Sequence, residues 1–252
     1  MLDQTQASDT PIRVRGLRKS FGQQKVLDGI DLQVRKGETL AVLGRSGTGK
    51  SVLLKLLVGL KTPDDGSVEV AGRNLVGLAL AELNEVRKRI GFLFQQAALY
   101  DSLTVEQNVE FPLRRHTDKA EQERRERARE LLASVGMEKD LEKLPSEISG
   151  GMQKRVGLAR ALALDPEIIL FDEPTAGLDP ITAREIGQLI VDLKTQREMT
   201  AVVVTHDLRG ARMFADRLVL LHEGKILAEG SFEELEHSQE KFVAQFLGEG
   251  GE

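Results

Sequence analysis

The sequence predicts an α/β fold in which helices cover a mainly parallel sheet. Three observations support this prediction: β-branched strands in the first third, a strand that runs through a glycine-rich turn into a helix, and strand-helix alternation in the last third. A charged helical segment interrupts the alternation in the middle of the chain. We therefore expect an α/β core with an antiparallel β subdomain and an inserted α-helical subdomain.

The first elements are antiparallel strands that lead into one central strand. Strands are expected at residues 12–17, 26–34 and 39–43, because these runs are β-branched or alternating and turns separate them. After Gly49, apolar residues follow at the spacing of a buried helix face. We expect that helix to end at Thr62-Pro63.

The middle of the chain, from about residue 101 to 147, has a different character. Residues 119–130 are almost all charged or alanine, and apolar positions follow, which is typical of a solvated helix face on a small helical subdomain. Strands return at residues 168–171 and 201–205, each before a helical pattern. We expect a single domain over residues 11–247, a helical subdomain at about 100–150, and flexible tails at 1–10 and 248–252.

Composition narrows the functional classes. The 252 residues include 35 Lys and Arg against 40 Asp and Glu, so the formal net charge is −5, and the two signs are interspersed. A nucleic-acid partner is therefore not indicated. The absence of cysteine excludes disulfides and thiolate chemistry and fits a reducing compartment. The longest apolar runs are far shorter than the roughly 18 to 20 residues of a membrane-spanning helix.

Residues 44–51 fit the phosphate-loop pattern G-x-x-x-x-G-K-[ST], between an expected strand and an expected helix. Glycines let successive N–H groups point at phosphate oxygens, and the helix N-terminus adds its positive end. Lys50 would reach the β- and γ-phosphates, and the Ser51 hydroxyl would bind Mg²⁺. The expected nucleotide-binding residues here are Gly44, Arg45, Ser46, Gly47, Thr48, Gly49, Lys50 and Ser51.

Polar residues follow two of the expected strands, 168–171 and 201–205, and the apolar stretch 90–94, at the edge where open parallel sheets bind ligands. Asp172 is assigned to the metal, and Glu173 is assigned as the general base that orients the attacking water. Capping of a helix before Pro174 is the alternative for these two acids. The Gln95 amide is expected to reach the metal or the lytic water, and a neutral His206 imidazole is expected to contact the γ-phosphate.

A second anion-binding helix N-terminus is expected at Ser149, Gly150 and Gly151, before the helical stretch 156–164. One nucleotide does not need two such cradles. We therefore expect this one to complete the site of a second copy in a two-fold, head-to-tail dimer. A simply capped helix is the alternative.

Taken in order, these motifs resemble the ATP-binding cassette family, the nucleotide-hydrolysing subunits of ABC transporters, over about residues 12–247. The resemblance implies a P-loop NTPase core of the RecA-like type, ATP and Mg²⁺, a homodimer, and an integral-membrane permease as partner. It adds Asp179 of the D-loop to the site. It also implies that Phe21 stacks on adenine, with core packing at a turn as the alternative.

Details of the sequence are similar to the Mla or Mce-type branch, which energises phospholipid transport. Met152 replaces the usual glutamine after the two glycines, and Lys154 and Arg155 follow; residues 49–55, 98–105, 108–117 and 245–248 also agree with this branch. The resemblance then implies Mce-domain and small accessory subunits. It also implies a cytoplasmic location, peripheral on the inner face of the cell membrane through the permease.

Several alternatives stay open at this level. A short-form importer for amino acids or other small solutes and a cell-division-type cassette fit the same motifs. Only enough chain follows His206 to finish the core and one terminal helix, so a long regulatory domain is not expected. A P-loop kinase would leave residues 149–151 unexplained, and a soluble cassette of DNA repair or translation would usually carry two cassettes or a coiled coil. The expected permease contacts are Phe94, Leu99, Tyr100 and Phe111.

Overall fold

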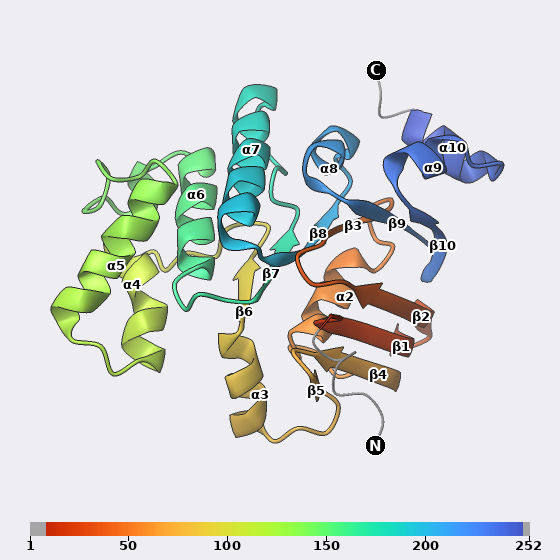
Figure 1. The fold of residues 1–252 in the computed structure, drawn as a ribbon, viewed down its shortest axis with the longest axis horizontal. Coiled ribbons are helices and arrows are strands. Elements are labelled where there is room, and N and C mark those ends of the chain that lie inside the picture. Colours follow the sequence, from red (N-terminus) through yellow and green to blue (C-terminus); the bar gives the residue numbers. More distant parts are fainter. Residues whose placement is uncertain (1–8, 249–252) are drawn as a thin grey trace.

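The computed structural model describes residues 9–248, which form two sheets and a set of helices (Figure 1). The strands are β1 (Ile12–Phe21), β2 (Gln24–Val34), β3 (Thr39–Leu43), β4 (Asp65–Val70), β5 (Arg73–Asn74), β6 (Ile90–Leu93), β7 (Ile168–Asp172), β8 (Thr200–Thr205), β9 (Arg217–His222) and β10 (Lys225–Gly230). An antiparallel sheet has the order β2-β1-β4-β5, and the larger sheet has the order β10-β9-β3-β8-β7-β6. Only β10 is antiparallel in the larger sheet. The predicted α/β class is confirmed.

The helices lie around the larger sheet. They are α2 (Lys50–Leu57), α3 (Leu80–Lys88), α4 (Val105–His116), α5 (Glu121–Ser134), the 3-10 turn η1 (Pro145–Glu147), α6 (Gly150–Ala161), α7 (Pro180–Arg197), α8 (Leu208–Phe214), α9 (Phe232–Glu236) and α10 (Lys241–Gly248). In Figure 1, α4, α5 and α6 lie at the opposite end of the molecule from the antiparallel sheet. Between residues 9 and 248, no helix combines the length and the apolar character that crossing a bilayer requires.

The larger sheet separates two hydrophobic cores. Successive residues of β3 alternate between them: Leu40 and Val42 pack with α2 and the antiparallel sheet, whereas Ala41 and Leu43 pack with the helices on the other face. Every residue of β3 is buried. Burial on both faces explains why the parallel strands are continuous apolar runs rather than alternating ones.

The register of the parallel strands brings their carboxyl ends to one edge. Leu43 of β3 is opposite Thr205 of β8, Asp172 of β7 is opposite Val204, and Leu93 of β6 is opposite Phe171. The residues that follow these positions therefore emerge side by side. This edge is where the expected site residues meet.

The expectation that the first long helix ends at Thr62-Pro63 is wrong, because α2 already ends at Leu57. Gly59 has φ of +64°, its N–H donates to Leu56 O at 3.0 Å, and the N–H of Leu60 donates to Lys55 O at 2.8 Å. These two bonds form a Schellman motif, which stops a helix at a left-handed glycine. Apolar residues continue at helical spacing beyond Leu57, so the spacing alone does not reveal where the helix ends.

Two further boundaries differ from expectation. After His206, α8, β9 and β10 complete the core as expected, but two terminal helices, α9 and α10, follow in the described chain where one was expected. The expected upper limit of the helical subdomain, about residue 150, falls at the start of α6, although α6 packs on α4 and α5. The expected tails lie outside the described residues except at their inner ends: Asp9 O accepts a hydrogen bond from Lys36 N, and Gly248 ends α10.

Candidate functional site

The phosphate loop connects β3 to α2. Gly47 and Gly49 have φ of +82° and +102°, which residues with a side chain rarely adopt. A Cβ on Gly44 would lie 2.9 Å from Thr48 Oγ1, and one on Gly49 would lie 2.9 Å from Val26 O, so neither position has room for a side chain. The loop therefore has the backbone shape that a phosphate cradle needs.

Lys50 places its charge inside this loop. The residue is only 6% exposed, and its ammonium donates to the carbonyl oxygens of Gly44 at 2.8 Å and Arg45 at 3.0 Å. Burial lowers the pKa of Lys50, while the charges of Glu173 and Asp172 act in the opposite direction. Its Nζ lies 4.0 Å from Glu173 Oε1, so the cation stands between the loop and the end of β7.

Ser51 and Asp172 meet where a metal is expected. Ser51 Oγ donates to Asp172 Oδ1 at 2.8 Å. A hydroxyl and a carboxylate are the hard oxygen donors that Mg²⁺ prefers, and few protein ligands suit an ion that keeps several waters. These residues fit Mg²⁺. Gln95 follows the neighbouring strand β6, where its backbone carbonyl accepts a hydrogen bond from Lys154; the metal role of its side chain stays a prediction.

Glu173 is held in a defined position at the end of β7. Its φ of +50° is unusual for a residue with a side chain. Its Oε2 accepts from Thr205 Oγ1 at 3.2 Å and from the His206 N–H at 3.3 Å, and it lies 2.9 Å from His206 Nδ1. One carboxylate oxygen thus faces β8 and the other faces Lys50, whereas Asp172 turns to Ser51. The two adjacent acids have separate partners.

His206 is well placed to contact a molecule bound at this edge. Its side chain is 59% exposed, although Nδ1 is tied to Glu173. The following Asp207 accepts from Thr175 Oγ1 at 3.0 Å and caps α8. The loop after β8 is therefore fixed to the loop after β7, while the imidazole stays open to solvent.

The second helix N-terminus has the expected cap. Ser149 Oγ accepts a hydrogen bond from Met152 N at 3.3 Å at the start of α6. This bond is what the alternative of a simply capped helix predicts for Ser149. Gly150 is exposed, and a Cβ on Gly151 would lie 2.5 Å from Thr182 Cγ2 of α7, so a larger residue there would displace the Thr182 side chain. Asp179 caps α7, because its carboxylate accepts from the N–H groups of Ile181 and Thr182.

Phe21 and Arg45 are two further residues that the sequence assigns to the nucleotide. Phe21, at the turn between β1 and β2, is 42% exposed, which argues against core packing. Lys61 Nζ is 4.8 Å from its ring centroid. The Arg45 guanidinium lies 5.5 Å from the ring centroid of Phe242 on α10, so the backbone of Arg45 rather than its side chain faces the loop interior.

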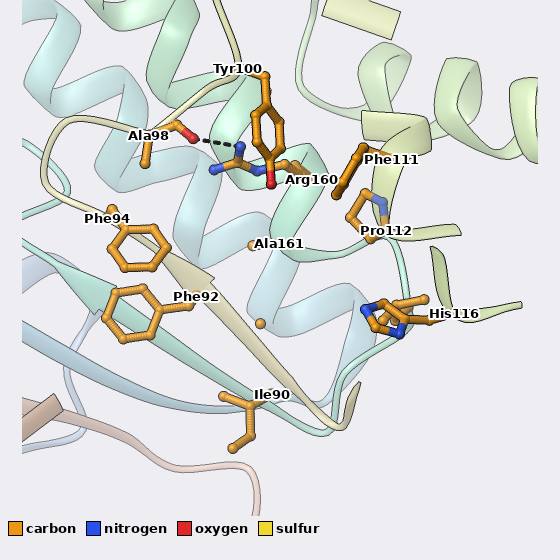
Figure 2. Close-up of a pocket in the computed structure, with 12 residues that line it drawn as sticks. Ile90, Phe92, Phe94, Ala98, Tyr100, Phe111, Pro112, His116, Arg160 and Ala161 are labelled. Atoms are coloured by element: carbon orange, nitrogen blue, oxygen red, sulfur yellow. Dashed lines mark hydrogen bonds between the residues drawn. The ribbon is translucent and has the colours of Figure 1, made fainter. Parts of the chain in front are cut away.

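A groove opens beside the loop that carries Gln95. Figure 2 shows Tyr100 and Phe111 next to each other, with Phe92 and Phe94 on a neighbouring part of the wall. The ring centroids of Tyr100 and Phe111 are 4.7 Å apart, and Tyr100 is 47% exposed. The cavity has a volume of about 440 Å³. Three of the four expected permease contacts line it, whereas Leu99 packs against the core instead.

Sequence reasoning missed the contribution of two buried polar residues. Thr205 looked like the end of a strand, yet its hydroxyl binds Glu173. In the sequence, Lys154 is only one residue of the motif that follows the two glycines. In the structure, its ammonium donates to the carbonyl oxygens of Gln95 and Glu173. The available signal was a lysine at helical spacing between Gly151 and Leu158, on the face that packs inward.

Comparisons with known proteins identify similar chains. Residues 27–176 match the sequence profile of the family described as ABC transporter. The probable ribonucleotide transport ATP-binding protein mkl of Mycobacterium bovis is 46% identical over 236 residues, which cover 94% of this chain and 66% of that protein. The chain thus spans about two thirds of the length of that relative. The intermembrane phospholipid transport system ATP-binding protein MlaF of Haemophilus influenzae is 42% identical over 94% of this chain and 89% of its own.

A solved structure has the same fold. The dimeric ATP-binding cassette MJ0796, in a post-hydrolysis state bound to ADP and Pi, superposes with a TM-score of 0.81 at 36% sequence identity. The superposition covers 87% of this chain and 98% of that one.

Proposed function

Because the chain belongs to the ABC transporter family, we propose that it is the ATP-binding and ATP-hydrolysing subunit of an ABC transporter. The observation that carries this proposal is the meeting of Lys50, Ser51, Asp172 and Glu173 at one edge of the sheet. These residues combine a phosphate-binding cation, two oxygen ligands and a fixed carboxylate. Such a set suits hydrolysis of a nucleoside triphosphate better than binding alone.

Each residue has a defined task in this proposal. The backbone of the phosphate loop and Lys50 hold the phosphates, and Ser51 and Asp172 hold Mg²⁺, which neutralises charge on the phosphate oxygens when it is bound. Glu173 accepts a proton from the attacking water through the oxygen that faces Lys50. Thr205 and His206 hold its other oxygen, so the carboxylate does not need to reorganise during the reaction.

The active unit in this proposal is a head-to-tail homodimer. The exposed Ser149 and Gly150 at the N-terminus of α6 would face the γ-phosphate bound by the partner copy, near Asp179. The similarity to the cassette MJ0796, which is dimeric with ADP and Pi bound, supports a dimer as the active unit. A capped helix explains the hydroxyl of Ser149, but it gives no reason for an exposed glycine beside it.

We further propose that the groove beside Gln95 seats a helix of an integral-membrane permease. Its walls include the exposed ring of Tyr100 and the half-buried ring of Phe111, and aromatic side chains in a concave site are typical anchors of protein interfaces. Asn108, which is fully buried, holds the loop of Tyr100: its side chain bonds both the N–H and the C=O of Tyr100. The anchor is therefore pre-ordered before a partner binds.

For the transported molecule we propose phospholipid moved between membranes, with Mce-domain and small accessory subunits as additional partners. The identity of 42% to MlaF over 89% of that protein supports this branch. The relative mkl carries a ribonucleotide transport name, so substrate assignment differs among similar chains. The subunit would be peripheral on the inner face of the membrane that holds the permease.

Purification from membranes under mild detergent tests both levels of this proposal. Copurification of a multispan permease and an Mce-domain protein, with ATP hydrolysis by the complex, is the expected result. A substrate-binding protein for amino acids or ribonucleotides in place of the Mce-domain protein would overturn the lipid assignment and leave the ATPase intact. Absence of ATP hydrolysis by the complex would reject the ATPase function itself.

A further inference from the structure

Lys154 is a buried cation between two loops of the candidate site. It lies on α6 and is 5% exposed. Its ammonium donates to the backbone carbonyl of Gln95 at 2.5 Å and to that of Glu173 at 3.0 Å. One side chain thus joins the ends of β6 and β7, which carry the residues assigned to the lytic water and to the general base.

Both loops contain backbone that needs support. Glu173 has φ of +50°, and Ala97 and Ala98, just after Gln95, have φ of +56° and +50°. Left-handed residues with a side chain are sterically disfavoured, so they persist only where neighbouring contacts hold them. Removal of a donor from a buried carbonyl destabilises such a loop further, because the carbonyl is left without a hydrogen bond. The hydrogen-bond donors that stabilise these two loops come from α6.

Arg160 completes the contact from the same helix. Its guanidinium donates to Ala97 O at 2.5 Å and to Ala98 O at 2.7 Å, the latter visible as a dashed line in Figure 2. Between the two cations, Gly157 allows close packing, since a Cβ there would lie 3.1 Å from the Cβ of Ala97. The loop after β6 therefore rests on α6 at Gln95, Ala97 and Ala98.

The same helix begins at the dimer surface of the proposed function. Ser149 caps α6, and Lys154 lies five positions further on, in the second turn. A helix moves as a rigid unit, so docking of its N-terminus against a partner's nucleotide also sets the position of the Lys154 ammonium. A single helix, α6, therefore extends from the partner's nucleotide to the residue that holds Glu173 of the same subunit.

We infer that Lys154 is a positioning residue that fixes Gln95 and Glu173 to α6, so that hydrolysis in one subunit depends on how its α6 docks on the partner. The inference rests on the proposed ATPase function and goes beyond it, because the assigned site residues do not include Lys154. Lys154 touches no phosphate in this scheme. It acts through the backbone of the two residues that orient water and accept its proton.

The test compares Lys154→Met, which keeps the length of the side chain and removes its donors, with Arg129→Met as a matched control. Arg129 pairs with the buried Glu106 in the helical subdomain, at 2.5 Å, away from both loops. In the full chain purified with its partners, Lys154→Met should lower kcat for ATP about 10- to 100-fold, because small misplacements of catalytic groups have effects of that size. The Kd for a non-hydrolysable ATP analogue should stay within about two-fold.

Arg129→Met should lower the melting temperature but leave kcat within about two-fold of the wild type. Lys154→Arg keeps a charged donor and should recover part of the lost kcat. If Lys154→Met does not fold, Lys154→Gln is measured by the same criteria.

A kcat for Lys154→Met near that of the wild type would overturn the inference, as would an equal loss of kcat in Arg129→Met. A wild-type complex that hydrolyses no ATP would instead reject the proposed function, so the two failures are distinguishable.

Discussion

Ser51 and Asp172 are 121 positions apart in the sequence, yet Ser51 Oγ donates a hydrogen bond to Asp172 Oδ1 at 2.8 Å. The bond joins the start of α2 to the end of β7, across the intervening strand β8. It therefore fixes the position of the phosphate loop relative to the carboxylates of Asp172 and Glu173.

Lys50→Ala should weaken ATP binding by about 10- to 150-fold, because hydrogen bonds to charged groups contribute roughly 1.5–3 kcal/mol. The loss comes from removing the cation that lies inside the loop. Titration with a fluorescent ATP analogue measures it. Lys55→Ala, on the same helix but outside the loop, is the control and should bind like the wild type. An unchanged Kd for Lys50→Ala would remove Lys50 from phosphate binding.

Glu173→Gln should keep ATP binding, lower steady-state hydrolysis by about 100-fold or more, and trap an ATP-bound dimer. The amide retains the size of the carboxylate but cannot accept the proton. Phosphate release and size-exclusion chromatography with ATP are the measurements, and the exposed Glu142→Gln is the control. Hydrolysis near the wild-type rate would exclude Glu173 as the general base.

Phe21→Ala should raise the Kd for ATP by about 2- to 10-fold, the loss expected for one aromatic stacking contact. Phe21→Tyr keeps the ring and should restore affinity. Competition by inorganic triphosphate separates the two parts of the nucleotide and should be equal in all variants. If ATP affinity is the same with and without the ring, Phe21 does not contact adenine.

Tyr100→Ala should leave ATP hydrolysis by the isolated subunit unchanged and reduce the amount of permease that copurifies with it. The reason is that Tyr100 lies in the groove beside Gln95 and is 47% exposed. Truncation of an aromatic anchor typically costs 2 kcal/mol or more, about 30-fold in affinity. Tyr100→Phe should retain binding. Normal copurification of Tyr100→Ala would move the interface elsewhere.

Glu38→Gln should make unfolding less dependent on acid. Burial by itself raises the pKa of Glu38, but hydrogen bonds from Arg217 and from the Arg35 N–H outweigh it, so the pKa lies below 4.5. A lowered pKa in the folded state gives stability that is present above about pH 4.5 and is lost as the pH falls through the folded value.

The variant should lose roughly 1.5–3 kcal/mol of unfolding free energy at pH 7. Urea unfolding at pH 7 and below pH 4 measures this change, with Glu142→Gln as control. An unchanged acid profile in Glu38→Gln would show that this buried pair does not contribute to acid sensitivity.

Much of the fold and several site positions follow from local sequence. The glycines of the phosphate loop need φ values that side chains disfavour, so their spacing identifies the loop without any tertiary contact. The apolar strand before Asp172 and Glu173 predicts that both acids emerge at a sheet edge. The end of α2 was missed because its Schellman hydrogen bonds do not alter the apolar period.

The sequence by itself therefore determined the α/β class, the phosphate loop and the strand ends on which polar residues stand, since backbone sterics and apolar periodicity act over a few residues. The tertiary structure alone decided that Ser51 meets Asp172, that Thr205 holds Glu173 and that Lys154 bridges Gln95 and Glu173. These contacts depend on strand order and helix packing, which bring together residues far apart in the chain. No local sequence pattern predicts which of these distant residues will meet.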